Sequence, residues 1–331
     1  MVNTVDIAGG ARPVRWGILG TASIARGQFL PALRSAGGAA EAVASRDADA
    51  AERYAAANTI ARAVTGYRTL IDDPDVDALY IALPNSLHAE WTIAALEAGK
   101  PVLCEKPLTG SLPDTRAVLD VARQTGTLLW EAFVFPFHDQ MARVRAALAS
   151  GVIGELREIQ SDFYFRVTRP DNIRLFADLQ GGALNDVGCY PIRLAFELFG
   201  RVHERVWASC VPGGQGVDLE SVAVLGYSGG RSLMLSCGMN RRYDTFTRLL
   251  GSDGEIRMSN PFHPSGSDRL DVLGREEEST AAAPLGEPSF TACIRHIQAV
   301  LGGREEPRQL AIDTALPTAQ ALHDLHAELG L

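Results

Sequence analysis

The stretch Val14-Arg15-Trp16-Gly17-Ile18-Leu19-Gly20-Thr21-Ala22-Ser23-Ile24-Ala25 decides the fold class of this chain. Its first seven residues form a largely apolar run that stops at a glycine, which is typical of a buried strand. Residues 23–36 then have the pattern of a helix. A strand, a tight glycine turn and a helix in immediate succession predict the start of a parallel, doubly wound sheet.

The same alternation continues through residue 134. Further strands are expected at residues 41–44, 78–83, 102–105 and 128–133, and helices at residues 47–57, 88–98 and 112–124. Strands and helices that alternate with short connections predict an α/β domain of the Rossmann type over residues 1–134. We expect the first twelve residues, which include Asp6, to be a frayed leader rather than a signal peptide.

The pattern changes in the second half, residues 135–331. A helix at residues 139–150 leads into strand-like segments at residues 156–167, 204–211, 222–227, 232–238 and 245–251, with one helix at residues 191–199 between them. Such a pattern predicts an α+β domain with a large, mostly antiparallel, open-faced sheet. Helices at residues 289–301 and 314–329 are expected to close the chain, and residues 259–288 are rich in loops.

Composition excludes several classes of protein. The net charge of −9 provides no basic face for nucleic acid. The sequence contains no run of 18 apolar residues, so no membrane span is predicted. The five cysteines are scattered without a C-x-x-C pair, which indicates a reducing cytoplasm and neither a zinc site nor a disulfide framework. The histidines form no metal-binding motif, so no metal is expected.

The turn after the first strand is a candidate cofactor site. Gly20, Thr21, Ala22, Ser23 and Ile24 occupy the place of the dinucleotide fingerprint G-x-G-x-x-G/A. Gly20 keeps the first glycine of the fingerprint, and Ala22 and Ala25 stand at its other two positions, which need small residues. The helix that follows would direct its N-terminal N–H groups at a pyrophosphate.

Residues after the next strands indicate which dinucleotide binds. Ser45 and Arg46 suit a ribose 2′-phosphate, because a guanidinium pairs with phosphate through two hydrogen bonds. We therefore expect NADP. Asp47 keeps NAD as the alternative, and Arg46 could instead be a solvated surface residue. Further along, Leu83, Pro84 and His88 are expected beside the nicotinamide half, where His88 either contacts the ribose or caps the next helix.

A rare lysine marks the chemical end of this domain. Of 31 basic residues only Lys100 and Lys106 are lysines, and only lysine can lose its proton at working pH. Lys106 lies in Cys104-Glu105-Lys106-Pro107, at the end of a predicted strand. We expect Glu105 and Lys106 to contact the cofactor and Lys106 to take part in proton transfer, the alternative being a surface lysine in a Lys-Pro loop.

A second motif, Gly181-Gly182-Ala183-Leu184-Asn185-Asp186-Val187-Gly188-Cys189-Tyr190-Pro191, leads into a helix. Asp186 and Tyr190 are four residues apart, so on a helical turn they share a face. Tyr190 could donate a proton to a carbonyl oxygen, while Asp186 holds a substrate hydroxyl, orients Lys106 or caps the helix. Arg174, just before this motif, could reach the substrate or the cofactor amide, or pair with a surface carboxylate.

Together these motifs resemble the Gfo/Idh/MocA oxidoreductase family. The resemblance implies a Rossmann domain followed by an open-faced domain whose sheet often mediates dimers or tetramers, and it implies that Lys106 is the active-site lysine. Many relatives have histidine where this chain has Tyr190. In this respect the chain resembles the branch of the family that contains sugar-nucleotide 3-ketoreductases, sugar 1-dehydrogenases and dihydrodiol dehydrogenases.

The leading hypothesis is an NADP-dependent oxidoreductase that reduces a ring ketone of a nucleotide-linked deoxy keto-sugar, a small carbohydrate, with Lys106, Asp186 and Tyr190 as catalytic residues. The alternatives are an NADP-dependent aldose 1-dehydrogenase, of the xylose or glucose type, and a trans-dihydrodiol dehydrogenase. A hypothesis from another class is a cofactor-binding regulator that has lost catalysis. The retained Lys106 and Asp186 argue against it.

Overall fold

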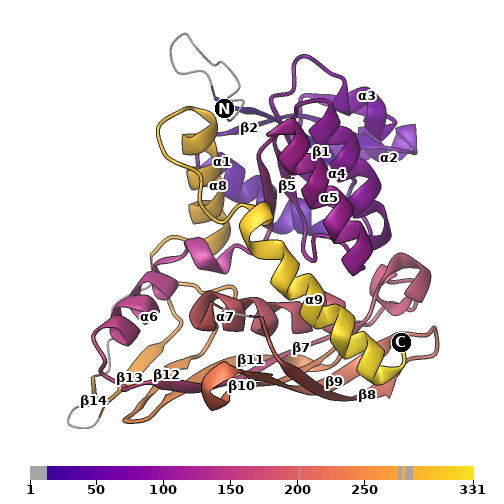
Figure 1. Ribbon diagram of the computed structural model, residues 1–331. Coiled ribbons are helices and arrows are strands. Elements are labelled where there is room, and N and C mark those ends of the chain that lie inside the picture. Colours follow the sequence, from indigo (N-terminus) through magenta and orange to yellow (C-terminus); the bar gives the residue numbers. More distant parts are fainter. Residues whose placement is uncertain (1–12, 201, 275–277, 280–285) are drawn as a thin grey trace. The chain divides into compact units, whose positions relative to one another are not determined.

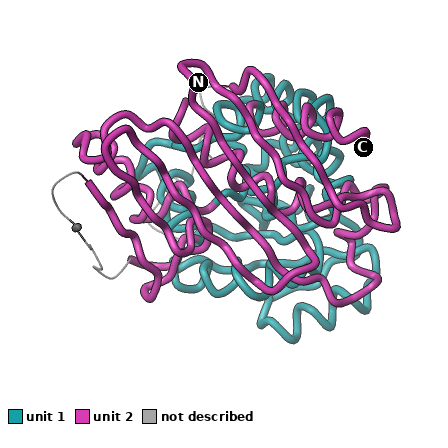
Figure 2. Tube along the Cα trace, turned by 90° about the horizontal axis from the view of Figure 1, so that it is seen from below, with its two compact units in different colours: residues 1–133, 290–316 teal, residues 134–289, 317–331 magenta. Residues whose placement is uncertain are grey.

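The computed structural model describes residues 13–200, 202–274, 278–279 and 286–331 (Figure 1). The expected leader at residues 1–12 lies outside them. The chain divides into two compact units, which Figure 2 shows in separate colours: unit 1 is Met1–Phe133 with Phe290–Leu316, and unit 2 is Val134–Ser289 with Pro317–Leu331. The prediction that everything after residue 134 belongs to the second domain is therefore wrong for Phe290–Leu316.

Unit 1 contains a six-stranded parallel sheet in the order β3-β2-β1-β4-β5-β6. Its strands are β1 (Arg15–Leu19), β2 (Ala39–Ser45), β3 (Arg62–Thr65), β4 (Ala78–Ile81), β5 (Val102–Cys104) and β6 (Leu129–Glu131). This is the strand order of a dinucleotide-binding Rossmann fold, in which the order reverses between the first and fourth strands. The predicted fold class is confirmed, although the short edge strand β3 was not expected.

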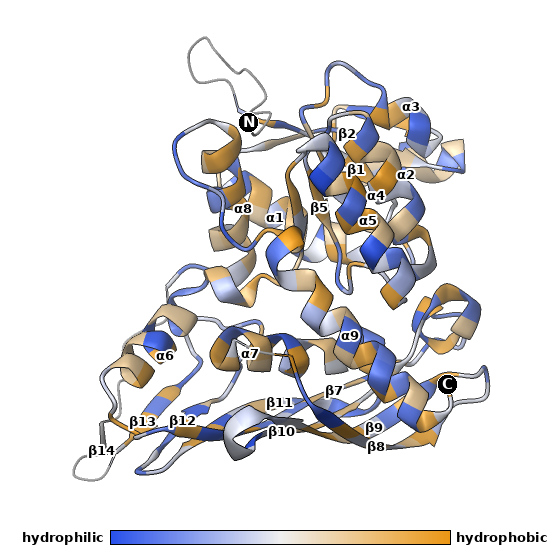
Figure 3. Ribbon diagram, in the orientation of Figure 1, coloured by the Kyte–Doolittle hydropathy of each residue, from blue (hydrophilic) through white to orange (hydrophobic). Residues whose placement is uncertain are grey.

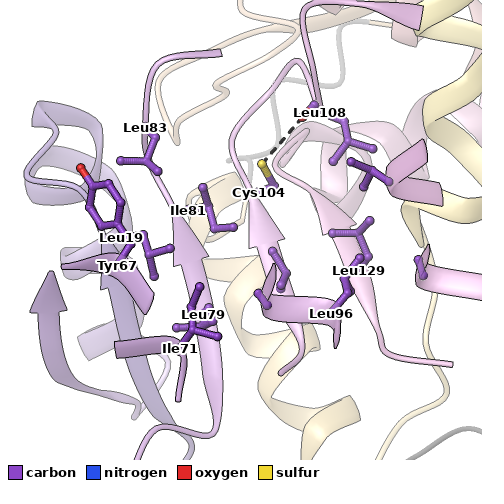
Figure 4. Packing of buried hydrophobic residues seen from close by; sticks show 14 of the residues in the cluster. Leu19, Tyr67, Ile71, Leu79, Ile81, Leu83, Leu96, Cys104, Leu108 and Leu129 are labelled. Atoms are coloured by element: carbon purple, nitrogen blue, oxygen red, sulfur yellow. Dashed lines mark hydrogen bonds between the residues drawn. The ribbon is translucent and has the colours of Figure 1, made fainter. Parts of the chain in front are cut away.

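The helices of unit 1 cover the sheet. They are a helix from Ser23 that continues through a π-helical turn (Ala25–Phe29) into α1 (Leu30–Ser35), then α2 (Ala48–Asn58), α3 (Tyr67–Ile71), α4 (His88–Glu97), α5 (Leu112–Thr125) and α8 (Ser289–Leu301). One core cluster contains a side chain from each of four neighbouring strands: Leu19, Ile81, Cys104 and Leu129 (Figure 4). Burial of apolar surface contributes about 25 cal/mol per Å² to stability. The packed cluster therefore holds the strand ends in fixed positions.

Local signals set where the helices begin and end. The Ser111 hydroxyl accepts a hydrogen bond from the backbone N–H of Asp114 at the start of α5, and Gly126 ends that helix in the left-handed conformation. The Phe290–Leu316 segment joins unit 1 through the Gln298 side chain, whose Nε2 donates to the carbonyl of Ala36 at 2.8 Å.

Unit 2 is built on an eight-stranded sheet in the order β14-β13-β12-β11-β7-β10-β9-β8. Only the β7–β10 pair is parallel among its described strand pairs. The strands are β7 (Leu156–Arg166), β8 (Arg205–Pro212), β9 (Asp218–Tyr227), β10 (Arg231–Gly238), β11 (Asn240–Gly251), β12 (Glu255–Met258), β13 (Leu270–Leu273) and β14 (Glu278–Ser279). The predicted mostly antiparallel sheet is confirmed, and Figure 3 shows polar and apolar residues interspersed along its strands.

The helices of unit 2 are α6 (Asp139–Ala149) and α7 (Cys189–Phe199), and α7 packs against β10 and β7. The last helix, α9 (Ala311–Leu329), contains Pro317, the residue at which the chain passes from unit 1 to unit 2. Among the described residues, no helix is long and apolar enough to cross a membrane.

Candidate active site

The carboxyl edge of the unit 1 sheet collects the predicted cofactor residues. Gly20 directly follows β1, Ser45 ends β2, Leu83 follows β4 by two residues, and Glu105 directly follows β5. In an open parallel sheet, ligands bind outside this edge at the point where the strand order reverses, which here lies between β1 and β4.

The turn after β1 requires glycine. Gly20 has a φ of +100°, and a Cβ atom there would lie 2.5 Å from the carbonyl oxygen of Ala82. Thr21 and Ser23 are exposed. The phenol of Tyr54 donates to the carbonyl of Ala22 at 3.0 Å, and burial raises the pKa of Tyr54 to about 12, so this donor stays protonated. The fixed, exposed turn before a helix N-terminus fits a pyrophosphate.

The residues after β2 divide into a cap and an exposed cation. Asp47 is the N-cap of α2, and its carboxylate accepts from the backbone N–H of Ala50 at 2.9 Å. The Ser45 hydroxyl accepts from the backbone N–H of Asp47 at 3.2 Å. Arg46 is exposed, and its positive charge acts on the phenol of Tyr67 against the burial that raises the pKa of that phenol. The arginine is therefore open to solvent, while the carboxylate that would read an NAD ribose is engaged in capping.

His88 is a brace within unit 1. Its ring is completely buried, with Nδ1 2.9 Å from the carbonyl oxygen of Pro107 and Nε2 2.9 Å from that of Leu83. It lies at the start of α4 and joins the Leu83-Pro84 turn to the loop of Lys106. The sequence left open a ribose contact or a helix cap; the structure instead engages both nitrogens with the backbone.

Two buried carboxylates hold the loop that carries Lys106. The phenol of Tyr80 donates to Oε1 of Glu105 at 2.5 Å, and the backbone N–H of Leu108 donates to Oε1 of Glu131 at 2.7 Å. The Glu105 carboxylate, expected at the cofactor, thus accepts a hydrogen bond from the core residue Tyr80. Lys106 itself is half-buried between these anchors. Sequence reasoning missed Tyr80 and Glu131, since each lies within a strand that looks purely structural.

In unit 2, the Gly181–Pro191 motif is fixed at its start by a buried carboxylate. Asp218 accepts from the backbone N–H of Leu184 at 2.9 Å and from the hydroxyl of Ser221 at 2.6 Å. Gly182 has a φ of +103°, and a Cβ atom there would collide with the Asp218 carboxylate. Asp218, which the sequence did not single out, therefore takes the helix-capping role that was one alternative for Asp186.

Asp186 pairs with Arg174. Nε of Arg174 lies 2.7 Å from Oδ2 of Asp186, and the two side chains are 36% and 13% exposed. Arg174 comes from the 3-10 turn Ile173–Leu175 and also lies over the ring of Phe165, at 5.7 Å. Arg174 therefore pairs with Asp186, a carboxylate inside the motif, rather than with a carboxylate elsewhere on the surface.

Tyr190 lies near the start of α7 in a cluster of aromatic rings. Its ring centroid is 5.3 Å from that of Phe163 and 5.1 Å from that of Phe262. The side chain is 5% exposed, and its hydroxyl lies 3.3 Å from Nε2 of His263. His263 falls within residues 259–288, where the sequence showed only a loop-rich stretch. Unit 1 thus collects the predicted cofactor residues and Lys106, and unit 2 collects Arg174, Asp186 and Tyr190.

Comparison with known proteins places these features in one family. Residues 14–133 match the family described as "Oxidoreductase family, NAD-binding Rossmann fold", and residues 141–257 match the "GFO/IDH/MocA C-terminal domain". The chain is 42% identical over 263 residues to a dTDP-3,4-didehydro-2,6-dideoxy-alpha-D-glucose 3-reductase from Streptomyces violaceoruber, covering 78% of this chain and 76% of that protein.

Two further relatives are similar over most of their length. A D-xylose 1-dehydrogenase (NADP(+)) from Haloferax volcanii is 37% identical over 250 residues, covering 75% of this chain and 76% of that protein. The crystal structure of KijD10, a 3-ketoreductase from Actinomadura kijaniata in complex with NADP and TDP-benzene, superposes with a TM-score of 0.88 at 34% identity, covering 96% of this chain and 98% of that chain.

These matches confirm the family that the motifs suggested and the prediction of an oxidoreductase. The N-terminal and C-terminal domains of the family match successive parts of the chain. A relative at 42% identity is covered over 76% of its length. The chain therefore belongs to the Gfo/Idh/MocA oxidoreductase family.

Proposed function

We propose that this protein is an NADP-dependent oxidoreductase that reduces a ring ketone of a nucleotide-linked deoxy keto-sugar. The observation that carries the proposal is Tyr190, a phenol in an aromatic cluster with its hydroxyl hydrogen-bonded, one helical turn after the Arg174–Asp186 pair. The similarity to two ketoreductases, at 42% and 34% identity, supports the same substrate class.

The chemistry follows from the residue types. The turn at Gly20 and the exposed Arg46 would hold NADPH, which would supply the hydride for the carbonyl carbon of the substrate. Tyr190 donates its phenolic proton to the carbonyl oxygen as negative charge develops there. A lysine cation beside a phenol stabilises the phenolate and so makes the proton easier to transfer, and this is the role that we propose for Lys106. Asp186, oriented by Arg174, accepts a hydrogen bond from a substrate hydroxyl and holds the ring in place.

NADP rather than NAD is supported by the turn after β2. The exposed Arg46 can form a two-pronged contact with a 2′-phosphate, and Ser45 adds a short polar side chain beside it. Asp47 caps α2, so its carboxylate already accepts a hydrogen bond from the backbone N–H of Ala50. Two of the relatives are named for NADP or were solved with it.

A second candidate is a reaction in the oxidative direction on another sugar, the NADP-dependent oxidation of an aldose at its first carbon. The 37% identity to a D-xylose 1-dehydrogenase favours it. The same groups serve both directions, because a phenolate at Tyr190 would accept the proton of a sugar hydroxyl. Two assays separate the candidates: NADPH consumption with dTDP-3,4-didehydro-2,6-dideoxy-glucose, and NADP⁺ reduction with D-xylose and D-glucose.

The decisive comparison uses wild type beside Tyr190→Phe and Lys106→Ala. We expect turnover with the keto-sugar, and a loss of kcat by at least about 100-fold in Tyr190→Phe, as for a positioned proton donor. Lys106→Ala should lower kcat as well. Turnover confined to aldoses would favour the second candidate. Binding of NADPH without turnover of any of these sugars would contradict both and leave the trans-dihydrodiol dehydrogenase and the cofactor-binding regulator.

We also propose that the protein forms a homodimer or homotetramer through the open face of the unit 2 sheet. Trp207, Val224 and Met234 are opposite one another on β8, β9 and β10, so they share one face, and Trp207 and Met234 are 52% and 45% exposed. Apolar side chains grouped on an exposed face are typical of interfaces. Trp207→Arg should give a monomer in sedimentation, whereas Val152→Arg, at an exposed turn, should not.

A reducing cytoplasm is the compartment that we propose for this enzyme. The cysteines at positions 104, 189, 210, 237 and 293 are all free thiols in the structure. Burial raises the pKa of the Cys104, Cys237 and Cys293 thiols, so these groups stay protonated and unreactive. A thiol titration of the native protein should therefore detect Cys210 first.

A further inference from the structure

The Tyr190 hydroxyl has a partner that the sequence did not reveal. Nε2 of His263 lies 3.3 Å from it, and His263 is half-buried whereas Tyr190 is 5% exposed. This distance is slightly longer than an ideal hydrogen bond, as catalytic contacts often are before substrate binds. His263 comes from the loop between β12 and β13, 73 residues beyond Tyr190.

The loop is built to hold His263 in place. The Asn260 side chain accepts from the backbone N–H of His263 at 3.2 Å and donates to its carbonyl at 2.7 Å. Asn260 is itself bonded to Asp268 at 3.2 Å, and Asp268 accepts from the backbone N–H of Ser265 at 2.6 Å. The Asn260 amide therefore hydrogen-bonds to both backbone groups of His263, and the Asp268 carboxylate holds that amide in place.

The rings around the pair fix its geometry. The imidazole of His263 lies edge-on to the Tyr190 ring at 5.3 Å and to the Phe163 ring at 5.9 Å. Phe163 stacks on Phe262 at 5.6 Å. In such an apolar surrounding a hydrogen bond is electrostatically stronger than in water. The only polar end of the Tyr190 ring is thus directed at the imidazole, by groups that all belong to unit 2.

We infer that His263 is a positioning and proton-relay residue for Tyr190. The inference rests on the proposed function. In the resting enzyme the phenol donates to a neutral Nε2, which orients the hydroxyl. When Tyr190 has given its proton to the carbonyl oxygen, the imidazole takes up a proton from solvent and passes one from Nε2 to the phenolate, which returns the imidazole to its neutral form. Overall, one ketone, one NADPH and one proton give one alcohol and one NADP⁺.

Titratable groups near His263 include Tyr190 on α7, Asp268 on the same loop, and Tyr243 on β11, whose ring meets Phe163 edge-on at 6.1 Å. Tyr190 shares a hydrogen bond with the imidazole ring. Substitution of His263 and of Tyr190, one at a time, therefore separates the part of the pH profile that needs both residues.

The kinetic test compares His263→Gln, His263→Phe and wild type, with His323→Gln on the exposed side of α9 as the matched control. We expect His263→Gln to lower kcat about 10-fold or more with KM within about twofold, because the proton path and not substrate binding is changed. The pH profile of kcat should lose one inflection. Added imidazole should restore part of the rate in His263→Gln and none in Tyr190→Phe.

A second measurement needs no substrate. In nitrogen NMR of histidine-labelled protein, the Nε2 resonance of His263, assigned by its loss in His263→Gln, should move in Tyr190→Phe. An unchanged resonance, or wild-type kcat and pH profile in His263→Gln while Tyr190→Phe is impaired, overturns the inference alone. Absence of turnover by wild type with every sugar overturns the proposed function, and the relay with it.

Discussion

The phenol oxygen of Tyr80 lies 2.5 Å from Oε1 of Glu105, and Glu105 directly precedes Lys106. Tyr80 is on β4 and Glu105 follows β5, so this bond ties the lysine loop to the neighbouring strand. Both side chains are buried, with exposed fractions of 0% and 8%. A buried carboxylate that loses a donor retains the cost of its desolvation.

Tyr80→Phe should therefore lower the free energy of unfolding by about 1–3 kcal/mol, the usual cost of leaving a buried polar group unsatisfied. Glu105→Gln, which keeps an acceptor for Tyr80, should cost less. Denaturant unfolding of the two single variants and the double variant measures the coupling, which we expect between about 0.5 and 3 kcal/mol. If Tyr80→Phe unfolds like wild type, Tyr80 does not brace the loop.

Arg46 should govern the choice between the two nicotinamide dinucleotides. Its removal takes away a charge-assisted contact worth about 1.5–3 kcal/mol, which corresponds to about a 10- to 150-fold loss for NADPH. Arg46→Ala should therefore lower the NADPH-to-NADH ratio of kcat/KM by that factor. Arg53→Ala, which removes the same charge from the exposed side of α2, is the matched control. An unchanged ratio in Arg46→Ala would mean that another group reads the phosphate.

Asp47 should affect the stability of the protein and not the choice of cofactor. Since its carboxylate accepts from the backbone N–H of Ala50, Asp47→Ala should cost about 0.5–2 kcal/mol of stability, while Asp47→Asn, also a good N-cap, should cost little. Neither variant should change the cofactor ratio. Thermal unfolding and the same kinetic ratio check both statements. A selective loss of NADH use in Asp47→Asn would restore the aspartate as a ribose ligand and NAD as the cofactor.

Much of unit 1 could be predicted because its signals are local. Apolar runs that stop at Gly20 or before Lys106, separated by amphipathic segments, specify strands and helices whatever the rest of the chain does. The four-residue edge strand β3 (Arg62–Thr65) escaped because it is short and alternates between exposed and partly buried residues. The return of Phe290–Leu316 to unit 1 escaped because it depends on contacts such as Gln298 with Ala36, 262 residues apart.

The residues of the candidate site also divide into those that local sequence signals indicate and those that tertiary contacts set. Gly20, Arg46, Lys106 and Tyr190 lie in motifs whose spacing has a physical reason, so the sequence indicated them. Their partners are set by tertiary contacts: Tyr80 for Glu105, Asp218 for the start of the Gly181–Pro191 motif, and His263 for Tyr190. A loop such as Asn260–Asp268 shows no periodicity, and its histidine gains meaning only when the fold places it beside a phenol.

His88 links stability to pH. Its two ring nitrogens each face a carbonyl oxygen, which would suit a ring protonated on both, but complete burial and the nearby charge of Lys106 disfavour an added cation. Burial is the larger effect and lowers the pKa of His88 below its ordinary value of 6.5. The unfolded chain then binds a proton more readily than the folded chain, so stability is present above about pH 6.5 and falls as the pH drops below it. Burial lowers the pKa of His138, His296 and His326 in the same direction.

We therefore expect the free energy of unfolding of wild type to decrease between about pH 7 and pH 5, by at most about 1.4 kcal/mol per pH unit for each proton taken up. His88→Gln, which keeps amide N–H groups but cannot titrate, should be less stable at neutral pH and have a shallower slope. His88→Leu, which cannot bond either carbonyl, should share the slope and lose more stability. Denaturant unfolding at constant ionic strength across this pH range measures both quantities. A His88→Gln slope equal to that of wild type would mean that the pKa of His88 is the same in the folded and unfolded chain. A steeper slope in His88→Gln would mean that His88 carries its proton in the folded protein, with both nitrogens donating to the carbonyls of Leu83 and Pro107.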